Sequence, residues 1–245
     1  MAIAQRPTEP AAEPLSTTPN QCWTSGSGAS YFKVCVSRHG NVVTLQSPSG
    51  KEHIAVGNIV EGYIACAKLS TGGSVLKYYD AGVAESGWAE PYKVTSTPSA
   101  VYRKTTDGKL ELVQKLTRDA AEFDFTIAMT LYNRSGNTLY GVYLDRYADF
   151  DINNTWGGDQ FHRSPRGVFG WDGTAQNLVS LTSLSTLNAA TAIHGSGGGW
   201  GMDTCNKPSA TSPTAAGDWI ARISYNFGTM AAGTSKTVKL LYRAQ

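Results

Sequence analysis

The strongest constraint on the fold is an alternation of apolar and polar residues, with a period of two, in the middle of the chain. Between positions 123 and 132, large apolar residues occupy every second position. Residues 139–152 repeat the alternation, and one face would carry Val142, Leu144, Arg146, Ala148, Phe150 and Ile152. Because successive side chains of a strand point to opposite faces of a sheet, both segments are predicted to be strands.

Shorter β-rich runs fill much of the remaining sequence. Turn-forming residues separate them at intervals of roughly 8 to 15 residues, and no segment has the pattern of a long amphipathic helix. Asp107 and Gly108 stand between two such runs and favour a tight hairpin with a two-residue turn. These patterns predict an all-β protein, folded as a large antiparallel β-sandwich of the jelly-roll or supersandwich type.

The first 20 residues differ in composition from the rest. They are rich in Pro, Ala, Thr and Glu and lack apolar periodicity, which predicts a disordered tail or linker at 1–20. Residues 21–245 are predicted to form a single sandwich domain. The alternative is two smaller sandwiches that divide near residues 93–100.

The charge and hydropathy patterns exclude two classes of partner. The chain has 21 basic and 19 acidic side chains, a net charge of +2, and no run of either sign. Nucleic-acid-binding domains normally present a basic stripe, so no nucleic-acid partner is expected. No apolar stretch reaches the ~20 residues that a membrane helix requires, so no membrane span is expected.

Four cysteines are spaced widely and contain no C-x-x-C pair, which argues against a zinc site. Three pairings into two disulfides exist, and we favour Cys22 with Cys35 and Cys66 with Cys205; buried free thiols are the alternative. Together with low charge and a high content of Gly, Ser and Thr, this predicts a secreted protein, extracellular or periplasmic.

The second alternating segment has an unusual polar face. It would carry Tyr143, Asp145, Tyr147, Asp149 and Asp151, a mixture of carboxylates and phenols that suits a sugar or a cation. Successive same-face residues lie about 6.6 to 7 Å apart, so carboxylates two residues apart could converge on a cation or stand at the separation of a glycosidase acid–base pair. Asp145 and Asp149 are the candidate catalytic carboxylates, and Asp149 and Asp151 are the candidate Ca²⁺ ligands. The alternative is a set of solvated carboxylates, or carboxylates paired with Arg146 or Arg163.

The next segment, residues 153–173, is predicted to be a long loop rich in aromatic and charged residues. Its candidate substrate-binding residues, with Tyr143 and Tyr147, are Trp156, Asp159, Arg163 and Trp171, because Trp beside Gly, Asn and Asp suits stacking on a sugar ring. His162 is the candidate general base. The alternative is a loop that covers a sheet edge and buries its own aromatic side chains. No G-x-S-x-G or H-E-x-x-H motif occurs.

Two segments carry a resemblance to a known kind of domain. Residues 131–152 contain N-x-S-G followed by R-x-x-D-x-D-I, and residues 225–242 open with Y-x-F-G before a glycine-rich turn. Together they resemble an uncharacterised β-sandwich domain of secreted bacterial proteins. The resemblance implies an exported bacterial β-sandwich and transfers no catalytic residue.

The sequence therefore supports three hypotheses of function. The first is an extracellular β-sandwich that recognises a polysaccharide or cell-surface glycan through the acidic-aromatic face, with no required cofactor and with Ca²⁺ as the ion that its carboxylates suit. The second is a carbohydrate-active enzyme, a glycoside hydrolase or lyase, that uses an Asp pair with His162. The third is a structural surface or filament subunit. The sequence does not define the oligomeric state.

Overall fold

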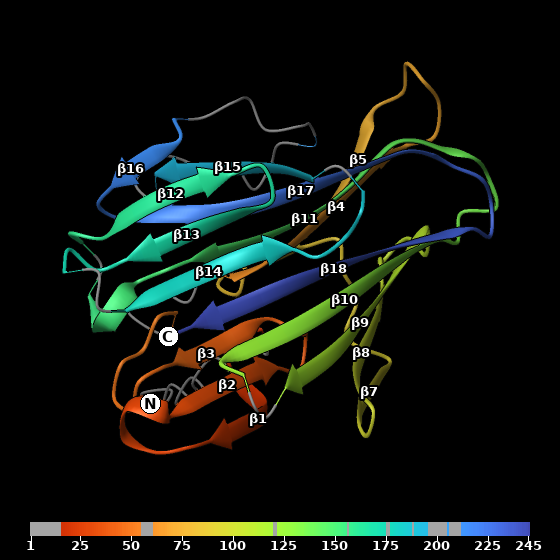
Figure 1. Cartoon of the computed structure of the whole chain (residues 1–245). Coiled ribbons are helices and arrows are strands. Elements are labelled where there is room, and N and C mark those ends of the chain that lie inside the picture. The colour runs from red at the N-terminus through yellow and green to blue at the C-terminus, as the bar shows by residue number, and fades with distance from the viewer. Residues whose placement is uncertain are drawn as a thin grey trace, which may run out of the picture.

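A computed structural model describes residues 16–54, 61–119, 122–155, 157–174, 177–187, 189–195, 205 and 212–245. All strand pairings among these residues are antiparallel, and they form three sheets (Figure 1). Regular helix is limited, in the same residues, to two 3₁₀ turns, η1 (Gly28–Ser30) and η2 (Ile152–Asn154). The predicted all-β antiparallel sandwich is confirmed.

The sheets contain three, nine and six strands. The three-stranded sheet has the order β1 (Pro19–Ser25), β2 (Phe32–Ser37), β3 (Val42–Gln46). The nine-stranded sheet has the order β16 (Thr214–Ala216), β12 (Gln160–Ser164), β13 (Gly167–Trp171), β14 (Leu178–Ser183), β18 (Ser235–Ala244), β10 (Asp124–Asn133), β9 (Leu110–Asp119), β8 (Ser99–Lys104), β7 (Lys93–Ser96). The six-stranded sheet has the order β15 (Ala189–Gly195), β17 (Trp219–Met230), β11 (Leu139–Asp149), β4 (Glu61–Lys68), β5 (Val75–Asp80), β6 (Glu85–Ser86).

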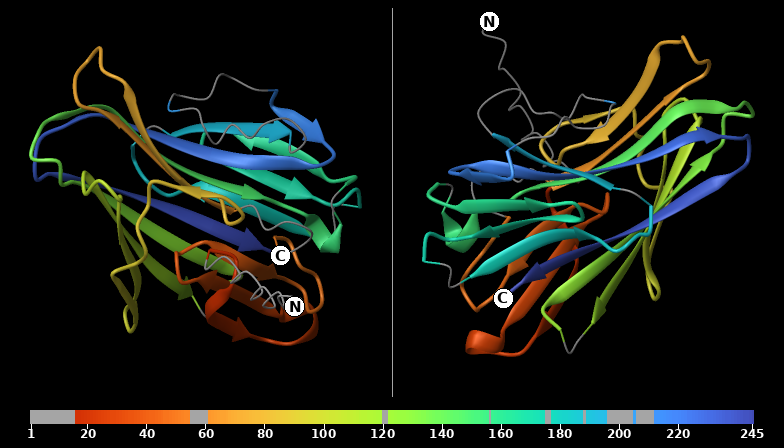
Figure 2. Two further views of the ribbon diagram at one scale, coloured as in Figure 1. Left: turned by 180° about the vertical axis from the view of Figure 1, so that it is seen from behind. Right: turned by 45° about the horizontal axis from the view of Figure 1, so that its top comes forward.

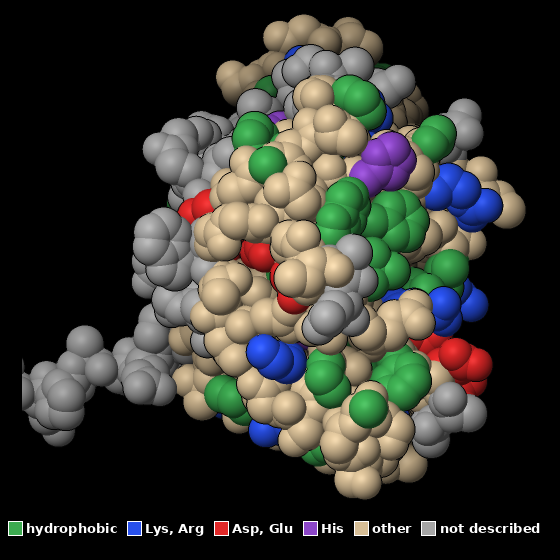
Figure 3. All heavy atoms as spheres, turned by 60° about the vertical axis from the view of Figure 1, so that its left-hand side comes forward, with side chains coloured by type: hydrophobic (Ala, Val, Ile, Leu, Met, Phe, Trp, Pro, Cys, Tyr) green, Lys and Arg blue, Asp and Glu red, His purple; other side chains and the backbone are tan. Residues whose placement is uncertain are grey.

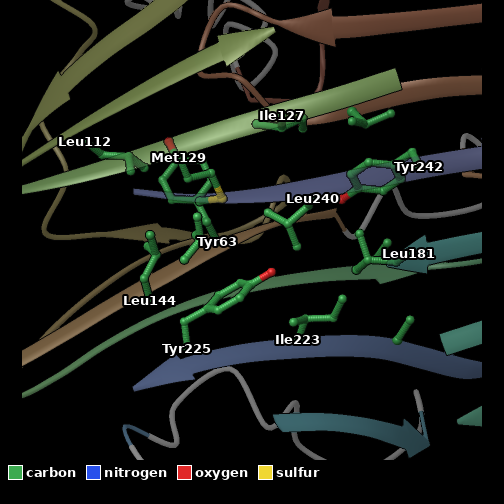
Figure 4. Close-up of a cluster of buried hydrophobic side chains, with 14 of the residues drawn as sticks. Tyr63, Leu112, Ile127, Met129, Leu144, Leu181, Ile223, Tyr225, Leu240 and Tyr242 are labelled. Atoms are coloured by element: carbon green, nitrogen blue, oxygen red, sulfur yellow. The ribbon is translucent and has the colours of Figure 1, made fainter. Parts of the chain in front are cut away.

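The two large sheets pack face to face and enclose one hydrophobic core. Figure 4 shows Met129 and Leu240 of the nine-stranded sheet pointing toward Leu144, Ile223 and Tyr225 of the six-stranded sheet, and all five are fully buried. In β10 the buried residues alternate strictly with half-buried ones, as the period-two pattern predicts. This alternation places Asp124, Thr126 and Thr130 of β10 on the outer face of the nine-stranded sheet.

The three-stranded sheet covers another part of the same core (Figure 2). The ring of Trp23 in β1 lies 5.4 Å from that of Phe125 in β10, between ring centroids. A disulfide between Cys22 and Cys35 joins β1 to β2. Residues on both sides of positions 93–100, such as Tyr63 and Leu240, belong to one core cluster.

A network of charged side chains lies inside this core, and we call its four members the arginine network: Glu61, Asp80, Arg103 and Arg146. Arg146 donates from Nε to Glu61 Oε1 at 2.5 Å and to the hydroxyl of Tyr242 at 3.0 Å. Arg103 donates from Nη1 to Asp80 Oδ2 at 2.6 Å. All four are fully buried, and each carboxylate has an arginine partner.

The structure corrects two details of the sequence interpretation. Residues 153–173 are not one long loop, because β12 and β13 pair within this range and form a hairpin. The connection between β8 and β9 is longer than the predicted two-residue turn, since the amide of Thr105 donates to the carbonyl of Leu110. Asp107 stabilises the wider turn by accepting hydrogen bonds from Thr105 Oγ1 and from the amide of Lys109.

At the N-terminus, the predicted tail and the described residues overlap by a few positions. Residues 1–15 of the predicted 1–20 tail lie outside the described part of the chain. Ser16 is buried and donates a hydrogen bond to the carbonyl of Gly82, and β1 starts at Pro19. No helix in the described residues is both long and apolar enough to cross a membrane.

Candidate functional site

Strand β11 contributes acidic and aromatic side chains to the outer face of the six-stranded sheet. Its apolar positions and Arg146 point into the core, so Tyr143, Asp145, Tyr147 and Asp149 point outward. The strand is the third in its sheet, between β17 and β4. Both neighbours therefore contribute side chains to the same outer face, in register with those of β11.

The middle of this face is an internal contact and not an open sugar platform. Asp145 is 2% exposed and forms an ion pair with Arg222 of β17, whose Nε donates to Asp145 Oδ2 at 2.9 Å. Burial raises the pKa of Asp145, and the positive charge of Arg222 opposes that shift. Tyr147 is equally buried, and its hydroxyl donates to the carbonyl of Asp80 at 2.6 Å. The arginine partner of Asp145 is thus neither Arg146 nor Arg163.

Most neighbouring groups on this face are also buried or half-buried, and Asn226 is exposed. Cys66 of β4 forms a disulfide with Cys205, and both pack into a small apolar cluster there with Tyr143. The hydroxyl of Tyr143 accepts a hydrogen bond of 3.0 Å from the side-chain amide of Asn226. His194 lies opposite Ile220 on β17, and burial together with the charge of Arg222 lowers the pKa of His194.

At the end of β11 four carboxylates gather, and we call them the Asp cluster: Asp149, Asp151, Asp159 and Asp218. Asp149, Asp151 and Asp218 each offer one oxygen, and these three oxygens lie within 4.8 Å of one another. Asp149 pairs with Ile220 across the two strands. Continuing that register by two residues places Asp151 opposite Asp218, just before β17.

Backbone hydrogen bonds position the rest of the cluster. Asp159 Oδ2 accepts from the amide of Ile152 at 3.1 Å, and the carbonyl of Asp159 accepts from the amide of Gly217 at 2.8 Å. Two asparagines at the end of the turn, Asn153 and Asn154, have φ angles of 62° and 64°. Asn tolerates this left-handed conformation better than most residues, so the turn can reverse sharply after Asp151.

The cluster concentrates negative charge in a buried place. Burial and repulsion from Asp151 and Asp218 raise the pKa of Asp149 to about 8. Burial and repulsion from Asp218 and Asp159 raise the pKa of Asp151 to about 7. The pKa of Asp159 rises to about 6, because burial and the charges of Asp172 and Asp218 outweigh the hydrogen bond from Ile152.

A second surface lies on the solvent side of β12, β13 and β14, and we call it the Trp171 surface: Gln160, His162, Phe169, Trp171 and Leu178. The strand register places His162 opposite Phe169, and Trp171 between Gln160 and Leu178. His162 is exposed, and the other four are half-buried. Figure 3 shows hydrophobic side chains gathered beside a histidine on this side of the molecule, with acidic side chains in the same view.

The structure brings some candidate residues together and separates others. Asp149, Asp151 and Asp159 meet in one cluster. Trp171 is followed directly by Asp172, whose charge helps to raise the pKa of Asp159. His162 projects from the outer face of the nine-stranded sheet, whereas Asp145 and Asp149 project from that of the six-stranded sheet. Arg163 points the other way from His162, toward Thr191. Trp156 lies outside the described residues. The catalytic and binding roles proposed for these residues stay predictions.

Sequence reasoning missed Asp218 and Arg222. Both have the same alternation phase as Ile220, opposite to that of the core residues Ala221 and Ile223, so the pattern marks them as outward-facing. The alternation does not show that β11 pairs with β17, a strand about 70 residues later in the chain. That pairing places Asp218 beside Asp151.

Comparison with known proteins adds information about the fold. The sequence matches no protein-family model and no curated protein. A bacterial glucoamylase, solved in complex with acarbose, has a similar structure with a TM-score of 0.64 at 9% identity, over 97% of this chain and 34% of that one. A polysaccharide lyase gives 0.47 at 13% identity over 93% of this chain and 32% of that one. A putative aldose 1-epimerase from Escherichia coli K12 gives 0.46 at 11% identity, over 92% and 99%.

At 9% identity the likeness to the glucoamylase shows the fold alone, and this chain spans about a third of that protein's length. The resemblance of residues 131–152 and 225–242 to a domain of secreted bacterial proteins stays a prediction. The likeness to the glucoamylase covers 97% of this chain, and the described residues form a β-sandwich.

Proposed function

We propose that this chain is an exported, non-catalytic β-sandwich module that recognises a carbohydrate. The observation that carries the proposal is the Trp171 surface. Phe169 and Trp171 lie two residues apart on β13 and point to solvent, while Val168 and Gly170 face the core. Same-face neighbours on a strand are about 7 Å apart, so the two rings present adjacent apolar patches on a rigid sheet.

The polar side chains around these rings supply the other half of sugar recognition. Gln160 and His162 stand directly opposite Trp171 and Phe169, and each can donate and accept hydrogen bonds. A sugar ring presents an apolar face to an aromatic side chain and hydroxyl groups around its rim. The combination therefore fits a sugar better than a purely apolar or a highly charged ligand.

The proposed binding surface differs from the acidic-aromatic face of β11 that the sequence predicts. Tyr147 and Asp145 are buried in internal contacts, so the middle of the outer face of β11 has little left to offer a sugar. Trp171 retains the role predicted for it, and His162 serves as a binding residue and not as a base. The adjacent Asp172 links this surface to the Asp cluster through its charge.

Two further observations support a carbohydrate ligand and an exported setting. A bacterial glucoamylase solved with bound acarbose has a similar fold, and this chain matches about a third of its length. The two disulfides are of the kind that persists in oxidising compartments, outside the cytosol.

The test is a panel of neutral and acidic polysaccharides, with acarbose as a soluble probe, scored in parallel for retention of the protein and for release of reducing or unsaturated ends. We expect retention on at least one polysaccharide without release of new ends. Trp171→Ala should weaken that retention about tenfold or more, because it removes a stacking surface. Tyr132→Ala is the matched control, since Tyr132 is a half-buried aromatic residue of β10 in the same sheet.

Three results would overturn the proposal. Equal retention of the wild type and Trp171→Ala would show that the Trp171 surface is not the binding site. Release of new ends would indicate a carbohydrate-active enzyme. Absence of both retention and release would favour a structural subunit, and sedimentation analysis of the same sample would then show self-association.

A further inference from the structure

Three carboxylates converge where β11 ends and β17 begins. One oxygen from each of Asp149, Asp151 and Asp218 lies within 4.8 Å of the others. Asp149 is the last residue of β11, Asp151 follows that strand and Asp218 precedes β17, and the pairing of Asp149 with Ile220 brings these chain ends together. Since grouped carboxylates are common on protein surfaces, their convergence alone does not identify a ligand.

An unsatisfied buried oxygen is the second observation. Asp149 is 7% exposed, and its Oδ1 has no hydrogen-bond partner among the described residues. The Oδ1 atom of Asp218 is in the same condition. A buried carboxylate oxygen without a partner is costly, because it has lost its hydration and gained nothing in return. A bound cation would supply the missing partner.

Other buried carboxylates of this protein show what is missing here. Asp145 has Arg222, Glu61 has Arg146, and Asp80 has Arg103. In the part of the chain that the structure describes, no lysine or arginine forms an ion pair with any member of the Asp cluster. The Asp cluster therefore differs from these pairs, because it brings three carboxyl groups together with no arginine or lysine partner among the described residues.

Asp159 has a supporting position in this arrangement. Its Oδ2 is already used by the amide of Ile152, which holds the turn that follows Asp151. It adds negative charge near Asp151 and Asp218 without offering that oxygen to a ligand. The open oxygens are those of the three convergent residues.

We propose that Asp149, Asp151 and Asp218 bind a divalent cation of the hard, oxygen-preferring class, with Ca²⁺ favoured. Carboxylate oxygens are the ligands that Ca²⁺, Mg²⁺ and Mn²⁺ prefer, whereas Zn²⁺ sites normally contain His or Cys. The irregular turn at one side of the cluster suits Ca²⁺, which accepts flexible geometry and several water ligands, better than the strictly octahedral Mg²⁺. The site holds one ion and links the end of β11 to the start of β17.

The cation site goes beyond the proposed carbohydrate recognition and does not depend on it. Its test uses no sugar, so failure of either proposal leaves the other intact. The full-length chain is stripped of metal with a chelator, and Ca²⁺ is then titrated by calorimetry, with Mg²⁺ in a parallel titration. Terbium luminescence provides an independent readout of the same carboxylates.

We expect one equivalent of Ca²⁺ to bind, and Mg²⁺ to bind more weakly. At a free Ca²⁺ concentration about 100 times the Kd, the melting temperature should rise by about 5–10 °C over that in chelator. Asp218→Asn should weaken Ca²⁺ binding about tenfold or more. Asp218 is the chosen position because it is only half-buried, so the isosteric amide should not prevent folding.

A sign reversal separates a cation site from a merely structural role. In chelator, Asp218→Asn should melt at or above the wild-type temperature, because it removes one of several repelling carboxylates; with Ca²⁺ it should melt below the wild type. Glu122→Gln, a change at an exposed carboxylate, is the control and should alter neither value. No calorimetric or luminescence response of the wild type at millimolar Ca²⁺, or equal binding by Asp218→Asn, would overturn the proposal.

Discussion

Two groups of acidic side chains in the described residues, the arginine network and the Asp cluster, differ in their partners: the first pairs its carboxylates with arginine, and the second does not. In the arginine network, Glu61 and Asp80 lie in the core between the two large sheets, and each accepts a hydrogen bond from a buried guanidinium. In the Asp cluster, four carboxylates lie at the end of β11 with no described cationic partner. Each carboxylate of the arginine network has a positively charged partner, whereas no carboxylate of the Asp cluster has one among the described residues.

The difference distinguishes a structural use of buried charge from a ligand-binding one. Burying a paired charge costs less than burying an unpaired one, but the pair rarely stabilises a fold more than apolar residues would. A group of unpaired carboxylates destabilises a fold unless something binds it. The arginine network is thus explained by the fold itself, whereas the Asp cluster calls for a partner.

The largest expected effect is at the centre of the arginine network. Arg146→Met fills a similar volume but leaves Glu61 buried without its partner, and the carbonyl of Gly40 also loses a donor. We expect the free energy of unfolding to fall by about 3–5 kcal/mol, measured by chemical denaturation. Arg134→Met is the control, because Arg134 is a half-exposed partner of Glu111 and should cost less than about 1 kcal/mol. An equal loss of unfolding free energy in Arg146→Met and Arg134→Met would show that the buried ion pair matters no more to stability than the half-exposed one.

The same chemical change should have opposite effects in the two regions. Asp80→Asn weakens contacts with Arg103 and His39 and should lower the free energy of unfolding by about 2–4 kcal/mol. Asp151→Asn, measured in chelator at mildly alkaline pH, removes a repelling charge and should raise it by about 1 kcal/mol. Destabilisation by both variants would mean that the Asp cluster is as complete as the arginine network.

How much of this contrast is visible in the sequence depends on the distance between the interacting residues. The alternation in residues 139–152 correctly assigns Asp145 and Asp149 to one face and Arg146 to the other, because that assignment needs only local geometry. It does not show that Arg146 meets Glu61, or that Asp145 meets Arg222. Those contacts need the register between strands, and irregularities in the pairing of β11 with both neighbours shift that register by amounts the sequence does not reveal.

His39 provides a pH-dependent test of the arginine network. Burial disfavours its charged form, but hydrogen bonds to Asp80 and Glu85 outweigh burial and the charge of Arg103, and the pKa of His39 rises from 6.5 to about 9. Its other ring nitrogen faces Glu90. Because the folded pKa is raised, the stabilisation is fully present below pH 6.5 and is lost as the pH rises through about 9.

The effect of protonation should be on the order of 2 kcal/mol. It is checked by the free energy of unfolding across this pH window, for the wild type and for His39→Gln. We expect the stability difference between the two proteins to shrink as the pH rises. A difference that is constant with pH would show that His39 contributes by packing and not by its charge.

The smallest expected effect on stability lies outside both regions, on the Trp171 surface. Trp171 is half-buried on the solvent face of an antiparallel sheet, and its cross-strand partners Gln160 and Leu178 stay in place when it is truncated. Trp171→Ala should therefore lower the free energy of unfolding by about 1 kcal/mol or less, while it weakens retention on polysaccharide. The comparison of interest is with Asp218→Asn, which should alter Ca²⁺ binding and leave the Trp171 surface intact. If Asp218→Asn also weakens retention, the Asp cluster and the Trp171 surface act together. The link between them would be Asp172, which follows Trp171 directly and whose charge helps to raise the pKa of Asp159.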